Sequence, residues 1–464
     1  MGKSNINLGY ILAISVASAF GGLLFGYDWV VIGGAKPFYE PFFGIAGSPF
    51  LQGWAMSSAL VGCFAGAGLS GMLSDAYGRK KLLLLAATLF IISALGTGAT
   101  STFWIFILFR LMGGVGIGLA SNLSPMYIAE ISPSSVRGRF VSLNQLTIVI
   151  GILAAQLINW QIADPVAPNT TLSEILASWN GQMGWRWMFY ACALPAILFF
   201  VFVLFIPESP RWLASKGRNE QAFAILKRIA GDESARRELE EIKKVRADDD
   251  TKPSFGNLFK SGAGRILTIG VVIAIFQQWC GINVIFNYAQ EIFSAAGYSV
   301  TDILFNIVIT GSVNLLFTFV AIYTVDKIGR RALMLIGAGG LALIYTILGS
   351  LYFFQVQGLP LLILVVLAIA CYSMSLAPIT WVVLTEIFPN RIRAAAMSVA
   401  TLALWAACFL LTYTFPLLNK GFGAAGTFWL YGVICVFGLV FIWIKLPETK
   451  GKSLEQIEEE LRGK

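Results

Sequence analysis

The sequence predicts an all-α membrane protein with twelve transmembrane helices arranged as two six-helix halves. Its 464 residues are 57% hydrophobic and only 12% charged, and the mean hydropathy is +0.75. A soluble domain carries about 25% charged residues, so this much apolar surface needs lipid as its solvent. Twelve long apolar runs and a set of motifs that recurs in the second half support the same architecture.

Each apolar run is long enough to cross a hydrocarbon core of about 30 Å, which takes about 20 helical residues. In chain order the runs are Tyr10–Tyr39, Phe50–Ser74, Leu82–Thr100, Phe103–Tyr127, Phe140–Ile162, Trp185–Ile206, Ile266–Phe293, Ile303–Thr324, Ala332–Phe354, Leu359–Leu384, Ala394–Leu418 and Ala425–Leu446. The first run lacks a small-residue cleavage site after a short apolar core, so we expect it to be retained as a helix.

The basic residues predict the topology. Lys and Arg cluster after the even-numbered runs, at Arg79, Lys80, Lys81, Arg137, Arg139, Lys327, Arg330, Arg331, Arg391 and Arg393. The alternate loops hold almost none, Lys36 and Lys420 being the exceptions. Positive-inside counting places both termini in the cytoplasm. The net charge of +8 is therefore a topology signal and not a nucleic-acid footprint.

One long loop, from Pro207 to Lys260, separates the first six runs from the last six. We expect residues 1–206 and 265–450 to form the two six-helix halves, 207–264 a cytoplasmic loop with short helices, and 451–464 a cytoplasmic tail. Ser453-Leu-Glu-Gln456 has the pattern of a capping box for a short C-terminal helix.

Three motifs repeat between the halves in the same order. Gly78-Arg79-Lys80 after Asp75 recurs as Gly329-Arg330-Arg331 after Asp326; Glu130 with Arg137 recurs as Glu386 with Arg393; Pro207-Glu208-Ser209 recurs as Pro447-Glu448-Thr449. Duplicated halves of this kind are typical of alternating-access transporters, whose binding site lies between the halves near the middle of the membrane.

Two charges are expected deep within the spans, Asp28 and Arg110. No charged residue occurs from Ser4 to Tyr27, directly before Asp28, or from Leu82 to Phe109, directly before Arg110. A charge near the bilayer centre costs roughly 2.5–3.5 kcal/mol, so an acid and a base retained there predict a functional site. Spans 1 and 4 run in opposite directions, and both residues lie at similar depths from the outer side, so contact between them is feasible.

Other chemistries have little support in the sequence. Histidine is absent, and the six cysteines show no metal-binding spacing. The spans carry no carboxylate cluster, nucleophile–base pair or set of metal ligands. We therefore expect no enzymatic activity, no metal site and no cofactor apart from a coupling proton.

Several motifs together resemble the sugar porter family of the major facilitator superfamily, closest to its bacterial proton-coupled symporters. The resemblance covers nearly the whole chain. Its motifs are Gly71-Met-Leu-Ser-Asp75-Ala-Tyr-Gly78-Arg79-Lys80, Arg110-Leu-Met-Gly113-Gly114-Val-Gly116, Pro207-Glu-Ser-Pro-Arg211, Gln277-Gln278-Trp-Cys-Gly281-Ile-Asn283 and Pro447-Glu-Thr-Lys450-Gly451. It implies the major facilitator fold and a sugar substrate.

A sugar presents hydroxyls that both donate and accept, and amide side chains match them on both counts. By resemblance, the sugar-contacting residues are Phe25, Gln145, Gln277, Gln278, Asn283, Asn287, Asn314, Trp381 and Trp405. Gly281 weakens its helix, and broken helices line transporter sites. The alternative for any one amide is a hydrogen bond between helices, worth about 0.6 kcal/mol.

Four positions depart from the pattern of the bacterial symporters. Ile152 and Leu404 stand where that pattern has glutamine, Asn287 stands where it has tyrosine, and Ala377 stands where it has glycine. The loss of two amides leaves the particular sugar open within the class of hexoses and pentoses.

The resemblance also implies roles for the charged residues. Asp28 would be the proton-coupling acid and Arg110 the partner that sets its pKa; facilitators of the family carry a neutral amide at the aspartate position. A cytoplasmic gate of salt bridges would close the inner face, formed by Asp75, Arg79, Glu130, Arg137, Asp326, Arg330, Glu386 and Arg393. The alternatives are a static ion pair at Asp28 and simple positive-inside anchoring at the inner face.

The sequence thus predicts proton-coupled import of a monosaccharide across the cytoplasmic membrane by a monomer in lipid. A uniporter of the same fold is the first alternative, and Asp28 argues against it. A transporter-like sugar sensor is the second, although such sensors usually add a long signalling tail. Sodium coupling is disfavoured because one carboxylate beside an arginine offers a cation few oxygen ligands.

Overall fold

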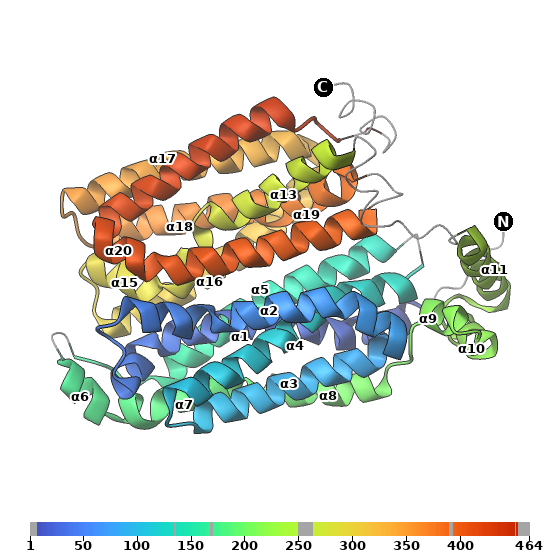
Figure 1. The fold of residues 1–464 in the computed structure, drawn as a ribbon, viewed down its shortest axis with the longest axis horizontal. Coiled ribbons are helices and arrows are strands. Elements are labelled where there is room, and N and C mark those ends of the chain that lie inside the picture. Colours follow the sequence, from blue (N-terminus) through green and yellow to red (C-terminus); the bar gives the residue numbers. More distant parts are fainter. Residues whose placement is uncertain are drawn as a thin grey trace.

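A computed structural model describes residues 7–133, 136–167, 170–248, 263–388, 393–450 and 452. The described residues form a bundle of long, roughly parallel and antiparallel helices, with three short helices set apart at one end (Figure 1). The predicted Ser453–Gln456 capping box lies outside the described residues.

The first six spans are built from α1 to α8. Their bounds are α1 Leu8–Phe43, α2 Pro49–Tyr77, α3 Arg79–Ala99, α4 Phe103–Ile131, α5 Arg137–Ile162, α6 Leu172–Ala177, a π-helical turn at Asn180–Gly184, α7 Trp185–Ala191 and α8 Ala193–Phe205. Helix α1 is longer than its predicted run and continues to Phe43 despite two internal prolines, Pro37 and Pro41. The π-helical turn and α7 join α8 to form the sixth span.

The loop between the halves contains α9 Pro210–Ser215, α10 Asn219–Ala230 and α11 Asp232–Asp248. These helices share a small apolar core that includes Trp212, Leu213 and Leu226. The backbone N–H of Asn7 donates to the carbonyl of Ile229, so the start of α1 lies beside α10. We call this the loop end of the bundle, and the opposite end the far end.

The last six spans are built from α13 Ala263–Trp279, α14 Ile282–Asn287, α15 Ala289–Ala295, α16 Val300–Ile328, α17 Arg330–Phe353, α18 Leu359–Ser373, α19 Leu376–Ile387 and α20 Arg393–Lys445. Span 7, in which we expected Gly281 to weaken the helix, is broken into α13–α15, and span 10, for which we expected no break, is divided into α18 and α19. Helix α20 combines spans 11 and 12, because it is 53 residues long and loses helical geometry at Gly423. Eleven described helices are therefore long and apolar enough to span a membrane, and one of them contains two of the twelve expected spans.

Close approach between helices depends on glycine at a few positions. A Cβ on Gly114 of α4 would lie 1.9 Å from the carbonyl oxygen of Ala59 on α2, and one on Gly118 would lie 2.3 Å from that of Cys63. Small residues spaced four apart let membrane helices approach closely. This packing explains the glycines that follow Arg110 in the sequence.

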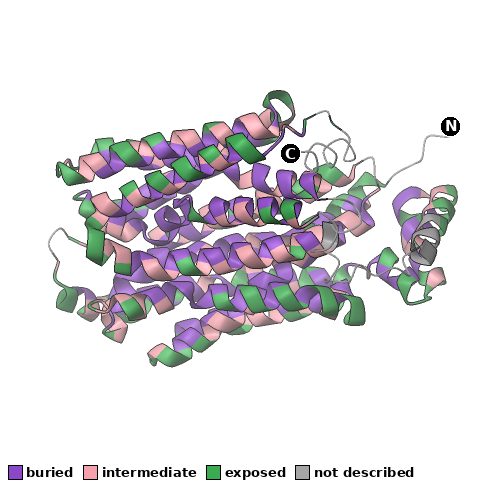
Figure 2. Cartoon of the chain, turned by 45° about the horizontal axis from the view of Figure 1, so that its top comes forward, coloured by how far each residue is buried: buried purple, intermediate pink, exposed green. Residues whose placement is uncertain are grey.

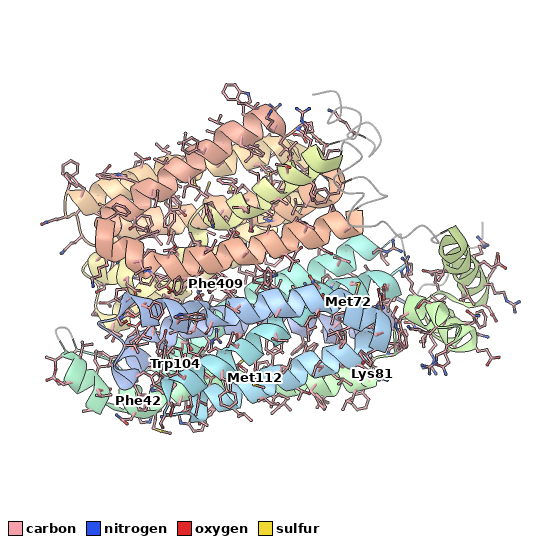
Figure 3. All side chains as sticks on the ribbon, in the orientation of Figure 1. Phe42, Met72, Lys81, Trp104, Met112 and Phe409 are labelled. Atoms are coloured by element: carbon pink, nitrogen blue, oxygen red, sulfur yellow. The ribbon has the colours of Figure 1, made fainter. Side chains whose placement is uncertain are left out.

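Buried residues fill the centre of the bundle, whereas its flanks expose large apolar side chains (Figure 2). Phe205 is 83% exposed and Phe437 is 71% exposed. Apolar surface on this scale fits a lipid environment. Figure 3 places the aromatic residues Phe42 and Trp104 near the far end and Lys81 near the loop end, which fits a bilayer between the two ends.

Candidate functional site

Asp28 and Arg110 are in direct contact at the centre of the first half. Arg110 Nη1 lies 2.8 Å from Asp28 Oδ1, and Arg110 Nη2 donates to the backbone carbonyl of Asp28 at 3.4 Å. Both residues are buried, at 3% and 2% exposure. Helices α1 and α4 hold the two side chains at the same depth, as the sequence predicts.

One oxygen of the aspartate remains unsatisfied. Among the described residues, Asp28 Oδ2 has no hydrogen-bond partner, although it is buried. Ser93 Oγ, also buried and unpartnered within that part of the chain, lies 2.4 Å from the position of a Cβ on Gly113, and Asp28 Oδ2 lies 3.8 Å from that position. The Asp28 carboxylate can therefore accept a proton at Oδ2 without first giving up its contact with Arg110.

Asp28 and Arg110 are not the only charged side chains buried among the described helices. Lys36 and Glu40 of α1 are 1% and 5% exposed. Lys36 Nζ lies 2.9 Å from Glu40 Oε1 and also contacts Glu291 Oε1 of α15. Lys36 lies within the predicted first run and Glu40 directly follows it, and contacts with α2 and α15 cover this part of α1.

Span 7 is interrupted between Gln278 and Asn283. Gly281 has φ +86° and separates α13 from α14, as its place in the sequence suggested. A Cβ at this glycine would lie 2.8 Å from Cγ of Tyr431. The left-handed backbone and the close aromatic ring both require glycine here.

We predict that Gly281→Ala lowers the thermal stability of the protein. A left-handed conformation costs an alanine about 1–2 kcal/mol, before the overlap with Tyr431 is counted. We expect the midpoint of thermal unfolding in detergent to fall by about 2 °C or more. Gly421→Ala is the matched control, because a Cβ there has no atom within 4 Å and should leave the midpoint unchanged. Equal midpoints for the two variants would contradict the prediction.

Three of the predicted sugar-contacting amides form a continuous hydrogen-bonded chain. Gln278 Nε2 donates to Gln277 Oε1 at 2.6 Å, Asn283 Nδ2 donates to Gln278 Oε1, and Gln277 Nε2 donates to the Tyr372 hydroxyl at 2.7 Å. Each of the three amides is less than 10% exposed. The chain crosses from span 7 to α18, and its members could exchange these bonds for sugar hydroxyls.

The amide chain is next to Asn314 and to an aromatic cluster. Ser373, which follows Tyr372 on α18, donates from Oγ to Asn314 Oδ1 of α16 at 2.6 Å. Asn283 Nδ2 also contacts Cys408 Sγ at 3.7 Å, and Cys408 lies one helical turn after Trp405. The structure therefore brings the amides of span 7 close to Asn314 of α16 and to the part of α20 that contains Trp405.

The aromatic cluster joins the two halves of the chain. The ring centroids of Phe25 and Trp405 are 5.8 Å apart, and Trp29 lies 5.9 Å from Phe25 and 6.1 Å from Trp405. Trp405 Nε1 is buried and has no hydrogen-bond partner in the described part of the chain. Apolar ring faces with an unused N–H beside them suit a sugar, which has both C–H and O–H groups.

The other residues predicted to contact the sugar are not hydrogen-bonded to the amide chain in the described part of the structure. Gln145, Asn287 and Trp381 lie on α5, α14 and α19, and no described hydrogen bond connects their side chains to the amide chain. Asn287 is 4% exposed with Oδ1 unpartnered among the described residues. Of the departures from the family pattern, Leu404 is 3% exposed and lies beside Trp405.

A charge cluster at the loop end of the first half contains three of the predicted gate residues. Arg79 forms two hydrogen bonds with Glu130, each 3.0 Å long, and contacts Asp75 Oδ1 at 3.3 Å. Glu208 accepts from the backbone N–H of Arg79 at 2.9 Å. Ser209 Oγ donates to Glu130 at 2.5 Å.

The second half repeats this cluster. Arg330 Nη2 lies 3.1 Å from Glu386 Oε1, and Thr449 Oγ1 donates to Glu386 at 2.5 Å. Glu448 accepts from the backbone N–H groups of Arg330 and Arg331 at 3.0 and 3.1 Å. Partial burial opposes ionisation of Glu448, but donation by Lys450, Arg330, Arg331 and Thr449 N–H groups prevails and lowers the pKa of this carboxyl.

The described gate contacts stay within each half. Arg137 donates to the carbonyl of Ser132, and the side chains of Asp326 and Arg393 lie outside what the structure describes. Contacts between the halves occur instead in the middle and toward the far end. There Trp54 of α2 meets Phe409 and Tyr413 of α20, with Phe409 labelled at that junction (Figure 3).

Sequence reasoning missed several residues of the site. Trp29 could have been found as the aromatic residue one turn after Phe25, and the repeated Pro-Glu motifs already contained Glu208 and Glu448. Tyr372 and Cys408 gave no signal, because a tyrosine and a cysteine in an apolar run are ordinary packing residues. In the described residues, no group of three or more Cys, Asp or Glu side chains could hold a metal ion.

Comparison with known proteins gives consistent matches along the whole chain. A family model described as "Sugar (and other) transporter" matches residues 14–461. The chain is 39% identical to the D-xylose-proton symporter of Escherichia coli (strain K12), over 98% of this chain and 96% of that protein. It is 38% identical to the arabinose-proton symporter of Bacillus subtilis (strain 168), over 98% of this chain and 95% of that protein.

A solved structure of the xylose transporter XylE from E. coli, in a partially occluded inward open conformation, is similar to this fold. The TM-score is 0.84 at 37% identity, and the match covers 96% of this chain and 100% of that chain. The order of the helices and the arrangement of the bundle are therefore those of a solved transporter.

Proposed function

The chain belongs to the sugar porter family of the major facilitator superfamily, and from that premise we propose that it imports a monosaccharide together with protons by alternating access. It is a multi-pass membrane transporter and not an enzyme. The observation that carries the coupling step is the buried contact between Asp28 and Arg110, in which one carboxylate oxygen is free to take a proton.

In the proposed cycle, protonation of Asp28 weakens its contact with Arg110 when the site is open to the outside. Sugar then binds between the amide chain of the second half and the Phe25–Trp29–Trp405 cluster. Because that cluster contains residues of both halves, sugar bound against it favours their approach. Residues 1–206 and 265–450 move as the two units, and the proton is released inside as Asp28 rejoins Arg110.

The loop end is assigned to the cytoplasm, with both termini on that side of the inner membrane. The basic residues at or just beyond the ends of α2, α4 and α16 support this orientation, as do the aromatic residues at the far end. The gate clusters Arg79–Glu130 and Arg330–Glu386 then lie at the cytoplasmic face, where they would meet across the halves when the site opens outward. We propose a monomer in lipid with the proton as coupling ion and no other cofactor.

The alternatives differ in what they require of Asp28. A uniporter does not require a buried acid beside Arg110, and the two relatives described above, from Escherichia coli and Bacillus subtilis, are named as proton symporters. A sugar sensor would bind sugar without moving it. Net accumulation of sugar against its gradient separates symport from both alternatives.

A competition-uptake panel tests the substrate and the proton link together. Proteoliposomes would take up a labelled pentose at an external pH of about 6 and about 8, in competition with pentoses, hexoses and polyols. We expect competition by hexoses or pentoses, because the amide and aromatic set suits a single ring, and faster uptake at the lower pH. Competition by polyols alone, or uptake equal at both pH values, would contradict the proposal.

A further inference from the structure

A buried cluster of three charges joins the two halves at the far end of the bundle, apart from Asp28 and Arg110. It consists of Lys36 and Glu40 from α1 and Glu291 from α15. Lys36 is 1% exposed, and the side chain of Glu291 is 24% exposed. We call these three residues the outer triad.

The outer triad exists only when the far end is closed. Lys36 and Glu40 belong to the first half and Glu291 to the second, so the contact between Lys36 Nζ and Glu291 Oε1 crosses between them. Nearby, a Cβ on Gly33 of α1 would lie 3.1 Å from the carbonyl oxygen of Phe286 on α14. Separation of the halves at this end would remove Glu291 from Lys36.

The charges of the outer triad do not balance. Two carboxylates share one ammonium group, and the guanidinium of Arg110 is already paired with Asp28. A buried charge without a partner is costly, and in proteins such a group is commonly neutralised instead. A single proton would bring the closed triad to zero net charge.

The structure indicates which oxygen takes the proton. Glu40 is ion-paired with Lys36 and its Oε2 accepts from Gln52 Nε2 of α2 at 3.2 Å. Glu40 Oε1 makes no hydrogen bond but lies 2.9 Å from Lys36 Nζ, whereas Glu291 contacts Lys36 through Oε1 and its buried Oε2 has neither an ion-pair contact nor a hydrogen bond among the described residues. The carboxyl from the second half is therefore the one left to be protonated.

Among the residues that the structure describes, the other groups near the triad do not supply a positive charge. Lys36 Nζ lies 5.5 Å from the ring centroid of Tyr288, whose hydroxyl donates to the carbonyl of Thr412 on α20. The hydroxyl of Tyr39 on α1 donates to the thioether sulfur Sδ of Met56 on α2 at 3.3 Å. Tyr431 of α20 also faces Tyr288.

We propose that Glu291 is a second proton-binding site, separate from Asp28, and that its protonation allows the outer side to close. The inference rests on the proposed function, because it assumes that the halves alternate. When the far end opens, Glu291 separates from Lys36 and can exchange its proton with external water. When it closes, an ionised Glu291 leaves the triad with one excess negative charge, so closure is favoured at low external pH.

The test uses sugar exchange in the background Asp28→Asn, which removes the proton step at Asp28. We expect exchange by this variant to be roughly fivefold or more faster at an external pH of about 5.5 than at about 8, with the internal pH fixed. Adding Glu291→Gln should abolish that difference, because glutamine is neutral at both values and close in shape. Lys36→Met should enlarge the difference, because it leaves two carboxylates without a cation.

Asp302→Asn is the matched control, since Asp302 is an exposed acid at the start of α16 that bonds to Ser299. In the Asp28→Asn background it should leave the pH dependence intact. Exchange that is independent of external pH, or that keeps its pH dependence with Glu291→Gln, would overturn the inference. Absence of sugar exchange by the unchanged protein would refute the proposed transport function itself, and the inference with it.

Discussion

Asp28→Asn is expected to abolish sugar accumulation driven by a pH gradient while sugar exchange continues. Asparagine keeps the size and polarity of the side chain but cannot carry the proton at Oδ2. A pH gradient of one unit supplies about 1.4 kcal/mol per proton, which is enough for a tenfold accumulation of sugar. In proteoliposomes with such a gradient, the ratio of internal to external sugar should fall from about 10 to about 1.

The control for this variant must account for Arg110, which loses its buried partner. An unpaired buried charge costs roughly 3–5 kcal/mol, so the single variant could lower stability. The double variant Asp28→Asn with Arg110→Gln removes the unpaired charge and should show the same uncoupled exchange. Asp302→Asn, an acid-to-amide change at an exposed site, should still accumulate sugar. Accumulation by either Asp28 variant would refute the coupling role.

The pairing of Asp28 with Arg110 could be predicted from the sequence because the two residues interrupt long uncharged stretches. Lys36 and Glu40 could not, because they lie at the predicted end of span 1, where charges are common. Their burial comes from the packing of α15 and α2 around this part of α1. A single sequence does not show which neighbours cover a helix end.

The two breaks within the spans also differ in how directly the sequence predicts them. Gly281 marks its break directly, because glycine is the residue that adopts a positive φ without strain. The break in span 10 occurs at Met374 and Ser375, and Pro378 in the first turn of α19 marks it less directly, by having no N–H to donate to the carbonyl of Met374. A Cβ on Gly337 of α17 would lie 2.2 Å from Ser375 Oγ, so contact with a neighbouring helix accompanies this break.

The gate clusters were predicted as residue pairs, but the partners that complete them were not. Gly78 and Gly329 both have positive φ, and a Cβ on either would lie within 3 Å of Glu208 or Glu448. The Gly-Arg motif and the Pro-Glu motif of each half are therefore parts of one structure. Their spacing in the sequence gave no indication of this, because the two motifs are separated by more than a hundred residues.

Gln278→Ala, which interrupts the amide chain, is expected to weaken sugar binding strongly. Gln278 lies in the middle of the chain, accepting from Asn283 and donating to Gln277. Its removal deletes possible sugar contacts, leaves Gln277 Oε1 without its donor and leaves Asn283 Nδ2 with only the contact to Cys408 Sγ, and an unsatisfied buried polar group costs about 1–3 kcal/mol. We expect the KM for uptake to rise roughly 10- to 100-fold, measured as initial rates against sugar concentration.

Asn159→Ala separates sugar binding from helix packing. Asn159 of α5 is 1% exposed, and its Nδ2 donates to the carbonyl of Val31 on α1 at 2.9 Å. It is therefore an amide that joins two helices of the same half, and its loss should lower thermal stability with little change in KM. If Gln278→Ala behaves like Asn159→Ala, the amide chain holds helices together and the sugar binds elsewhere. A raised KM for Gln278→Ala alone would place the sugar at the break in span 7, because a shared loss of packing would affect the two variants alike.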